Sequence, residues 1–356
     1  MILSLVHMDL TSLTITPELL RLITEIDEFK GSWRAQSTQN PERLQALRHV
    51  ATIESIGSST RIEGAKLSDS AIEALLSKVG KTSFITRDEQ EVVGYAEVME
   101  TVFEHYPQIP ITENYIKQLH ATLLRHSDKD TRHRGDYKKH ANNVEAFSPE
   151  GKSLGIVFET TTPFDTPSQM QDLLLWTRET LADNSYHPLI ITAIFNVVFL
   201  AIHPFQDGNG RLSRVLVSLL LLKSGYSYIP YASLESIVEK NKEAYYLALQ
   251  RTQRTLREDK TDWLPWLRFI LNALKRQKDH LAEKTAALEH YSALPHESML
   301  IMQYVESHHR ITIRETEHLI TTITRPTIKN RLSDLVAQGF LVRHGKARGT
   351  WYSKPE

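Results

Sequence analysis

The chain has 356 residues, of which 41% are hydrophobic and 24% are charged, with 14 glycines and 14 prolines. This composition is typical of a folded, soluble protein with two or three domains, and it excludes collagen-like, low-complexity and wholly disordered chains. The 42 Lys and Arg residues nearly balance the 43 Asp and Glu residues, so no global charge draws the chain to nucleic acid or an anionic membrane, and the absence of cysteine excludes disulfides, thiolate zinc sites and cysteine nucleophiles.

The N-terminal segment MILSLVHMDL has no Lys or Arg ahead of its apolar residues, so it lacks the charged start of a secretory signal. We therefore expect a cytoplasmic protein. Apolar residues then recur at helical spacing from Leu19 to Phe29, and again in SAIEALLSKV, where Ser68 and Ser70 are candidate caps. These patterns predict that the first 125 residues are mostly helical.

Helical periodicity stops between about Gly135 and Pro167. Polar and apolar residues alternate there around Ser-Pro-Glu-Gly, a turn signal, which predicts a β-hairpin or flap on a helical body. The following run PLIITAIFNVVFLAIH is apolar around nearly its whole circumference, which is typical of a helix at the centre of a bundle. Residues 188–202 are too few to span a bilayer, so we interpret them as core.

A long amphipathic stretch begins near Asp262 and leads through Pro295 into a segment of different character. Residues 297–307, 312–320 and 325–338 have the pattern of three short helices. The run GFLVRHGKARGTWYS then has the pattern of two strands around a basic turn. Three helices followed by a hairpin is the order of a winged helix.

The segment from Glu297 onward is modestly basic, with nine Lys or Arg residues against six Asp or Glu residues. A winged helix that reads DNA needs donors on its third helix and along its wing. Winged helices attached to enzymes also serve as protein contacts or dimer arms, so both roles stay open. The residues that would supply the donors are Thr324, Arg325, Thr327, Lys329, Arg331, Arg343, Lys346 and Arg348.

A polar break, IHPFQDGNGRLSR, separates two very apolar helical runs between Ile202 and Arg214. Gly208 and Gly210 allow positive φ and close approach of the backbone to a ligand, and the next helix begins directly after them. Such a turn is a candidate anion site, because unpaired N–H groups and the positive end of the helix dipole face the bound oxygens. Arg211 and Arg214 lie three residues apart and would clamp two phosphates, so the pattern predicts a polyphosphate ligand.

Two further side chains of this break indicate chemistry. Asp207 supplies a hard oxygen suited to Mg²⁺, which takes one or two carboxylates alongside substrate phosphates. His203 takes a proton near pH 7 and is the candidate base. Standard phosphate motifs do not fit, because Gly151-Lys-Ser153 has Ala146 where a P-loop needs glycine, and Gly-Asn-Gly lacks the third glycine of a dinucleotide fingerprint.

The run HPFQDGNGR from His203, followed by Arg214, resembles the signature of the Fic family, H-x-F-x-(D/E)-G-N-G-R-x-x-R. Residues Ser59 to Gly64 resemble the family's inhibitory pattern (S/T)-x-x-x-E-(G/N), in the position typical of the class with an N-terminal inhibitory helix. The resemblance covers roughly residues 20–350, and Asn196 departs from it where many relatives have a His or an aromatic residue. Other family-like features are Trp33, the DEQEV run from Asp88, the Pro-Phe after the flap, and Tyr245-Tyr246.

The resemblance implies transfer of AMP from ATP, with Mg²⁺, to a Ser, Thr or Tyr hydroxyl of a protein, the chain itself included. It implies that His203 deprotonates this hydroxyl, that Phe205 anchors the loop and that Asp207 holds Mg²⁺. The residues implied to bind phosphate are Gly208, Asn209, Gly210, Arg211 at the β-phosphate and Arg214 at the γ-phosphate.

The same resemblance implies how the site would be regulated and how it would bind its partners. Glu63 would pair with Arg214, turn the α-phosphate away from in-line attack and so slow the resting enzyme. The flap from about Val144 to Phe158 would align a target segment by strand pairing. Asn241 and Tyr245 are candidates for contact with adenine or ribose.

We therefore expect a mainly α fold: a Fic-type helical bundle with a β-hairpin flap and a C-terminal winged-helix domain. The expected parts are a helical region with the inhibitory helix (1–105), the Fic catalytic domain (106–290) and the winged helix (291–356). Two other functions stay open, namely removal of AMP with Glu63 orienting the water, and a DNA-binding regulator that uses the Fic fold as a nucleotide sensor. No membrane partner is expected, and the oligomeric state, a homodimer included, is left open.

Overall fold

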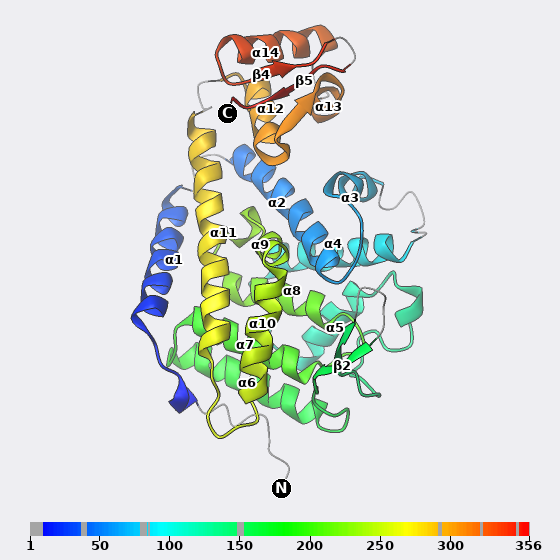
Figure 1. Cartoon of the computed structure of the whole chain (residues 1–356), viewed down its shortest axis with the longest axis vertical. Helices are drawn as coiled ribbons and strands as arrows, with labels where there is room; N and C mark the ends of the chain where they lie inside the picture. Colours follow the sequence, from blue (N-terminus) through cyan, green and yellow to red (C-terminus); the bar gives the residue numbers. More distant parts are fainter. Residues whose placement is uncertain are drawn as a thin grey trace. The chain divides into compact units, whose positions relative to one another are not determined.

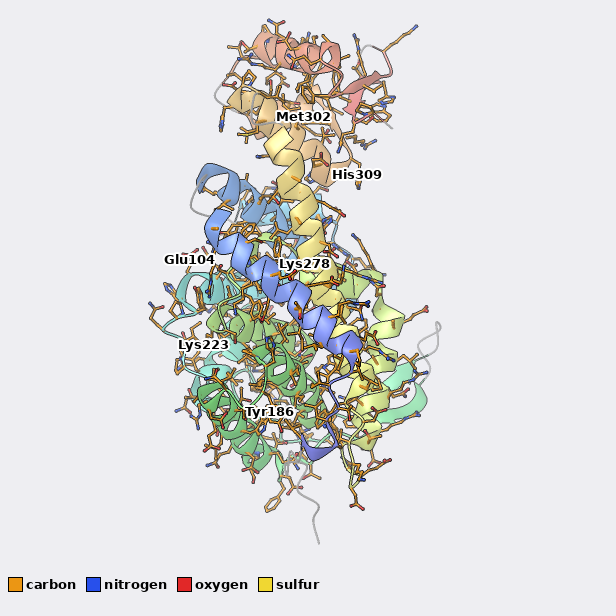
Figure 2. All side chains as sticks on the ribbon, turned by 90° about the vertical axis from the view of Figure 1, so that its left-hand side faces the viewer. Glu104, Tyr186, Lys223, Lys278, Met302 and His309 are labelled. Carbon is orange, nitrogen blue, oxygen red and sulfur yellow. The ribbon has the colours of Figure 1, made fainter. Side chains whose placement is uncertain are left out.

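The computed structural model describes residues 10–36, 41–78, 84, 86–147, 153–290, 294–320, 323–346 and 349–355. The chain divides into two compact units, Met1–Lys278 and Asp279–Glu356. The division falls inside the long helix α11 (Leu264–His290), on which Lys278 is marked in Figure 2. The three-part division at residues 105 and 290 remains a prediction.

The first unit is mainly helical, as the sequence predicted (Figure 1). Three short 3₁₀ helices and one pair of strands interrupt its helices in the described part of the chain. In chain order the elements before α11 are η1 (Leu10–Ser12), α1 (Pro17–Gln36), α2 (Pro41–Ile62), α3 (Asp69–Leu76), α4 (Arg87–His105), α5 (Glu113–Leu123), η2 (Asp128–Asp130), β1 (Val144–Phe147), β2 (Ser153–Phe158), α6 (Thr166–Asp183), α7 (Pro188–Ile202), α8 (Asn209–Lys223), η3 (Ile229–Tyr231), α9 (Leu234–Lys240) and α10 (Lys242–Thr255).

Helices α7 and α8 form the centre of this unit. Every residue of α7 from Leu189 to Ile202 is buried, which confirms that this apolar run is core. Helix α7 packs against α6, α8 and α10, and α8 in turn contacts α2, α4 and α5 (Figure 1). The indole N–H of Trp266, on α11, donates to the Ala193 carbonyl at 2.8 Å and ties α11 to α7. None of the helices in the described ranges combines the length and apolar character needed to cross a bilayer.

The predicted flap is present as an antiparallel pair of strands. Val144 is paired with Phe158 and Phe147 with Ser153, and the register shifts twice between these ends. The predicted turn at residues 148–152 lies outside the described residues. The hairpin therefore joins the loop after α5 to the start of α6.

The second unit has the order of elements that the sequence predicted, with one addition. The sheet order is β3-β5-β4, and both pairings are antiparallel. Strand β3 was not predicted, because three residues are too few to show alternation. After the end of α11 the elements are α12 (His296–His308), β3 (Arg310–Thr312), α13 (Ile313–Leu319), α14 (Arg325–Ala337), β4 (Val342–His344) and β5 (Trp351–Ser353).

Candidate functional site

The loop between α7 and α8 begins at a strained histidine. His203 ends α7 in the left-handed conformation, with φ 53° and ψ 59°, while its N–H still donates to Phe199 O at 2.9 Å. Pro204 follows and cannot continue the helix, since it has no N–H to donate. The left-handed turn at His203 therefore directs the chain out of the core at the place where the candidate base stands.

Two buried side chains hold this loop in place. The Phe205 ring is fully buried and stacks on the His120 ring at 3.8 Å between centroids, as expected for an anchor. The Asn209 amide closes the loop on itself, because its Oδ1 accepts from Phe205 N at 2.9 Å and its Nδ2 donates to Phe205 O at 2.7 Å. Asn209 thus uses both polar atoms to brace the loop, and a phosphate contact by its side chain remains a prediction.

The His203 ring is neutral and presents one nitrogen as an acceptor. Its Nδ1 lies 3.3 Å from Leu200 O, and a carbonyl can only accept, so the proton of this contact sits on Nδ1 and leaves Nε2 as the acceptor. Burial lowers the pKa of His203 to about 4, and nearby Lys138 lowers it further, although the Leu200 carbonyl and the carboxylates of Glu63 and Asp207 act against this. At neutral pH the ring is therefore uncharged and able to accept a proton.

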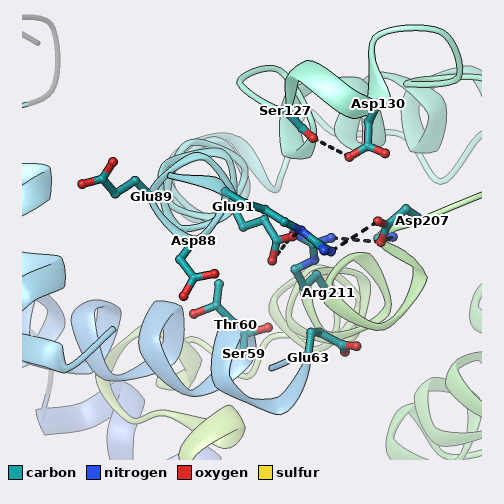
Figure 3. A network of polar contacts seen from close by, with 12 residues as sticks. Ser59, Thr60, Glu63, Asp88, Glu89, Glu91, Ser127, Asp130, Asp207 and Arg211 are labelled. Carbon is teal, nitrogen blue, oxygen red and sulfur yellow. Dashed lines mark hydrogen bonds and ion pairs between the residues drawn. The ribbon is translucent and has the colours of Figure 1, made fainter. Parts of the chain in front are cut away.

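Asp207 carries an ionised carboxylate surrounded by cations (Figure 3). Its Oδ2 accepts from Lys129 Nζ at 2.7 Å, and its Oδ1 accepts from Arg211 at 3.1 Å and from Gly208 N at 2.5 Å. Burial would raise its pKa, but Arg211, Lys129 and the Gly208 N–H together hold it at about 2. The described residues contain no cluster of three or more His, Asp or Glu side chains that would form a closed metal site. One accessible carboxylate fits Mg²⁺ that arrives with phosphate oxygens.

Arg211 is a buried guanidinium with free hydrogen-bonding capacity. Its side chain is 2% exposed and lies between Asp207 and Glu91, with NH1 at 3.1 Å from Glu91 Oε2 (Figure 3). Among the described residues, its Nε has no hydrogen-bond partner. An unsatisfied buried donor is costly, and a ligand oxygen would satisfy it. This observation agrees with the predicted phosphate contact.

Arg214 faces α2, one helical turn further along α8. Its Nε donates to Ser59 Oγ at 2.8 Å, and its NH2 donates to Ser59 O at 3.0 Å and to Glu63 Oε1 at 2.8 Å. The predicted Glu63–Arg214 pair is therefore present. Arg214 thus contacts the first and fifth residues of the inhibitory pattern, Ser59 on α2 and Glu63 directly after the end of α2.

The glycine of the inhibitory pattern explains how Glu63 reaches the site. Gly64 has φ 105°, and two bonds, Ala65 N to Thr60 O and Gly64 N to Arg61 O, close α2 in a Schellman motif. Glu63 thus occupies the capping position just beyond the last helical residue. A side chain at Gly210 would collide with the Glu63 carboxylate, since a Cβ there would lie 2.2 Å from Oε1.

Glu63 occupies the place of an anion. Its carboxylate lies over the first turn of α8, where free N–H groups and the positive dipole end attract negative charge. Burial would raise its pKa, but the charge and hydrogen bond of Arg214, with smaller contributions from Arg211 and His203, lower it below the usual value. The carboxylate is therefore charged, and it fills one side of the candidate anion site.

The candidates for contact with the base or sugar lie at the start of α10. Asn241 donates from Nδ2 to Ile237 O at 2.7 Å and accepts from Arg276 at 3.0 Å, so its amide already has partners. Tyr245 is buried against Trp266. Nucleotide contacts by Asn241 and Tyr245 remain predictions. Asn196, the departure from the family pattern, donates to Ser213 O at 3.4 Å between α7 and α8.

Sequence reasoning missed two supporting residues, His120 and Lys138. The His120 ring accepts from Gly135 N at 2.9 Å and lies 3.0 Å from Asp207 O, so it joins the loop after α5 to the candidate metal ligand. Lys138 is buried behind His203 and bonds to Ile202 O at 3.0 Å. A single histidine among apolar residues and a lysine in a basic run carry no sequence signal for such roles.

Comparison with known proteins shows which family the region around this site resembles. Residues 110–221 match the model of the Fic/DOC family, a range that includes the flap and the whole loop from His203 to Arg214. Over this range, which is less than a third of the chain, the protein is similar to the Fic/DOC family. Glu63 and the second unit lie outside the matched range.

Individual relatives extend the similarity beyond this range. The chain is 26% identical over 264 residues to a protein of Drosophila mojavensis named protein adenylyltransferase Fic, covering 73% of this chain and 47% of the relative. It is 25% identical over 311 residues to the protein of the same name from Drosophila grimshawi, covering 86% of this chain and 57% of the relative. The chain thus spans about half the length of the curated relatives it matches.

A solved structure shares the fold. The crystal structure of a Fic family protein from Desulfovibrio desulfuricans G20 matches with a TM-score of 0.61 at 23% identity, and the match covers 96% of this chain and 97% of that chain. This similarity concerns the fold alone.

Proposed function

We propose that the chain is a protein adenylyltransferase that transfers AMP from ATP to a Ser, Thr or Tyr hydroxyl of a protein, and that Glu63 inhibits it at rest. The observation that carries the proposal is the α7–α8 loop, which combines a neutral histidine whose Nε2 can accept a proton, an ionised aspartate and two buried arginines at a helix N-terminus. The name carried by the Drosophila relatives supports the same reaction.

The geometry supports the following roles in the transfer step. Nε2 of His203 takes the proton of the target hydroxyl, whose oxygen attacks the α-phosphorus of ATP. The bond from the α-phosphorus to its bridging oxygen breaks, and pyrophosphate leaves with that electron pair. The N–H groups of Asn209 to Arg211 and the guanidinium of Arg211 stabilise the charge on the phosphates. Phosphoryl chemistry of this kind needs a base, fixed positions and charge stabilisation.

Asp207 is the residue that would hold Mg²⁺. When bound, the metal neutralises phosphate charge and helps orient the leaving group. The carboxylate would then exchange its contacts with Lys129 and Arg211 for the metal. Arg211 would turn its freed donors, including the unpartnered Nε, to the β-phosphate.

Inhibition follows from the Glu63–Arg214 ion pair. While Arg214 NH2 donates to Glu63, it is not available to the γ-phosphate, and the negative Glu63 carboxylate repels phosphate oxygens from the first turn of α8. ATP would then bind with its α-phosphate out of line for attack. Inhibition is therefore misalignment of the substrate rather than exclusion of it.

Incubation of the full chain with ATP labelled at the α-phosphate, with and without Mg²⁺, tests the proposal. We expect label on protein only with Mg²⁺, and more label after Glu63→Gly. Release of label from AMP-modified protein, without transfer from ATP, would contradict the proposal and favour removal of AMP. Absence of both reactions would favour a nucleotide-sensing role.

We further propose that the second unit is a winged helix that binds DNA. The support is the exposure of Arg325 and Lys329 on α14, of Arg343 in β4 and of Lys346 after it; the predicted wing residue Arg348 lies outside the described residues. Removal of residues 296–356 is expected to abolish salt-sensitive duplex binding without lowering ATP affinity. If the intact chain binds no duplex DNA at low salt, the second unit does not read DNA. Its role is then to bind protein, in the simplest case a second copy of this chain.

A further inference from the structure

Both roots of the flap converge on one buried ammonium group, that of Lys138. Its Nζ donates to Asn142 Oδ1 at 2.8 Å, just before β1, and to Thr160 Oγ1 at 2.9 Å, just after β2. Its third hydrogen bond runs to Ile202 O at 3.0 Å, at the end of α7. All three donors of the ammonium are thereby used, and each binds a different segment.

The same group of residues holds the backbone that carries His203. Lys138 N donates to Pro204 O at 2.8 Å. Asn142 Nδ2 donates to Phe205 O at 2.6 Å and to His203 O at 3.3 Å. The Thr160 hydroxyl donates to Asn142 Oδ1 at 3.0 Å, which closes a ring of hydrogen bonds among Lys138, Asn142 and Thr160. We call these three residues the flap bracket.

A charged Lys138 at this buried position costs free energy. Lys138 is 3% exposed, and among the described residues no carboxylate pairs with its ammonium group. Burial accordingly lowers the pKa of Lys138 to about 7. Burial of a cation among neutral acceptors costs free energy that an apolar side chain would not. A role in packing alone therefore gives no reason for a lysine at this position.

We propose that Lys138 is a positioning residue that fixes both roots of the flap against the backbone of His203. A target segment laid along the flap then presents its hydroxyl to His203 Nε2 in one defined register. The inference rests on the proposed AMP transfer, and it assigns to the flap bracket the alignment of the acceptor with the base. The nucleotide is held separately, by the N-terminus and arginines of α8.

Thr160 offers the sharpest test, because one substitution removes its hydroxyl and keeps its shape, while another removes its methyl group and keeps the hydroxyl. Thr160→Val removes the hydroxyl that joins Lys138 to Asn142, whereas Thr160→Ser keeps it. Both are made in the full chain with Glu63→Gly, and the readouts are transfer of labelled AMP to the protein itself and affinity for ATP. Because displacement of reacting groups by about 1 Å costs on the order of 100-fold in rate, we expect Thr160→Val to lose roughly 10 to 100-fold in transfer. Thr160→Ser should stay within about twofold of the parent, and ATP affinity should be the same in all three proteins.

Equal transfer by Thr160→Val and Thr160→Ser would overturn the proposal. Loss of ATP affinity in step with transfer would also overturn it, since that indicates general damage to the fold. If Thr160→Val does not fold, Asn142→Asp replaces it: the carboxylate keeps the acceptor for Lys138 and loses the donors to His203 O and Phe205 O. Its expected loss of transfer is of the same order.

Amide hydrogen exchange separates this proposal from the proposed function. The Lys138 N–H, which donates to Pro204 O, should exchange at least about tenfold faster in Thr160→Val than in Thr160→Ser, whether or not AMP is transferred. Faster exchange in a chain that never labels protein would support the flap bracket and contradict the proposed reaction. Equal exchange in the two variants would contradict the flap bracket itself.

Discussion

The arginines of the α7–α8 loop and those of the second unit differ in what surrounds them. The side chains of Arg211 and Arg214 are 2% and 7% exposed and lie among carboxylates, hydroxyls and helix termini. The side chain of Arg325 on α14 is 62% exposed and pairs with Glu317 at 3.2 Å. A buried guanidinium must be compensated by partners or a ligand, whereas an exposed one is stable in water. Buried arginine therefore points to a binding site far more strongly than a basic surface does.

The largest expected effect concerns the base of the buried site. His203→Ala should lower AMP transfer by roughly 100 to 10,000-fold, the range for loss of a general base, and leave ATP affinity nearly unchanged. The reason is that Nε2 faces the incoming hydroxyl, while the phosphates are held by α8. Transfer is measured with α-labelled ATP and affinity by calorimetry. Transfer at the parent rate would remove His203 from the role of base.

Two substitutions, each of which removes the carboxylate partner of one arginine, compare the buried ion pair with the exposed one. Glu91→Ala leaves Arg211 with one carboxylate fewer in a buried site, so the free energy of unfolding of the first unit should fall by about 3 to 5 kcal/mol. Glu317→Ala removes the partner of exposed Arg325, and its cost should stay within about 1 kcal/mol. Denaturant titration with probes in each unit measures both. Equal costs would show that burial does not set the strength of these pairs.

The rate of AMP transfer at acid pH should show where His203 takes up a proton. Its folded pKa of about 4 lies below the ordinary value, so the ring stays neutral at pH 7 and takes up a proton only as the pH falls through 4. Transfer should be independent of this group above about pH 5 and fall to about half of its plateau near pH 4. Single-turnover rates from pH 3.5 to 7 test this. A decline centred near pH 6.5 would mean that His203 is not held neutral by its surroundings.

The sequence predicted those features that depend on short-range patterns. The apolar run of α7, the hairpin and the three helices of the second unit follow from periodicity and turn residues, and all are present. The ion pair between Glu63 and Arg214 was predicted because two motifs were read together. The roles of His120 and Lys138 were not predictable, because each depends on carbonyls and rings brought close only by folding. Partners remote in the sequence leave no local pattern.

The protein partners of Asn209 and Asn241 could not be predicted from the sequence either. Ligand contacts by both remain predictions, but their amides also have protein partners that the sequence did not indicate, namely Phe205 for Asn209, and Ile237 and Arg276 for Asn241. An amide beside a site is as well suited to brace a loop as to bind a nucleotide. Only the folded backbone decides which carbonyl it meets.

The most direct test of the account is the rate of AMP transfer at saturating ATP and Mg²⁺ for four proteins: the parent, Glu63→Gly, Glu63→Gln, and Glu63→Gly with Arg214→Ala. A hydrogen bond between charged groups is worth about 1.5 to 3 kcal/mol, so freeing Arg214 should raise the rate roughly 10 to 100-fold. Glu63→Gln keeps the size of the side chain and removes its charge, and it should fall between the parent and Glu63→Gly. Loss of Arg214 should lower the rate again. A Glu63→Gly protein no faster than the parent would contradict the claim that the Glu63–Arg214 pair holds the enzyme inactive.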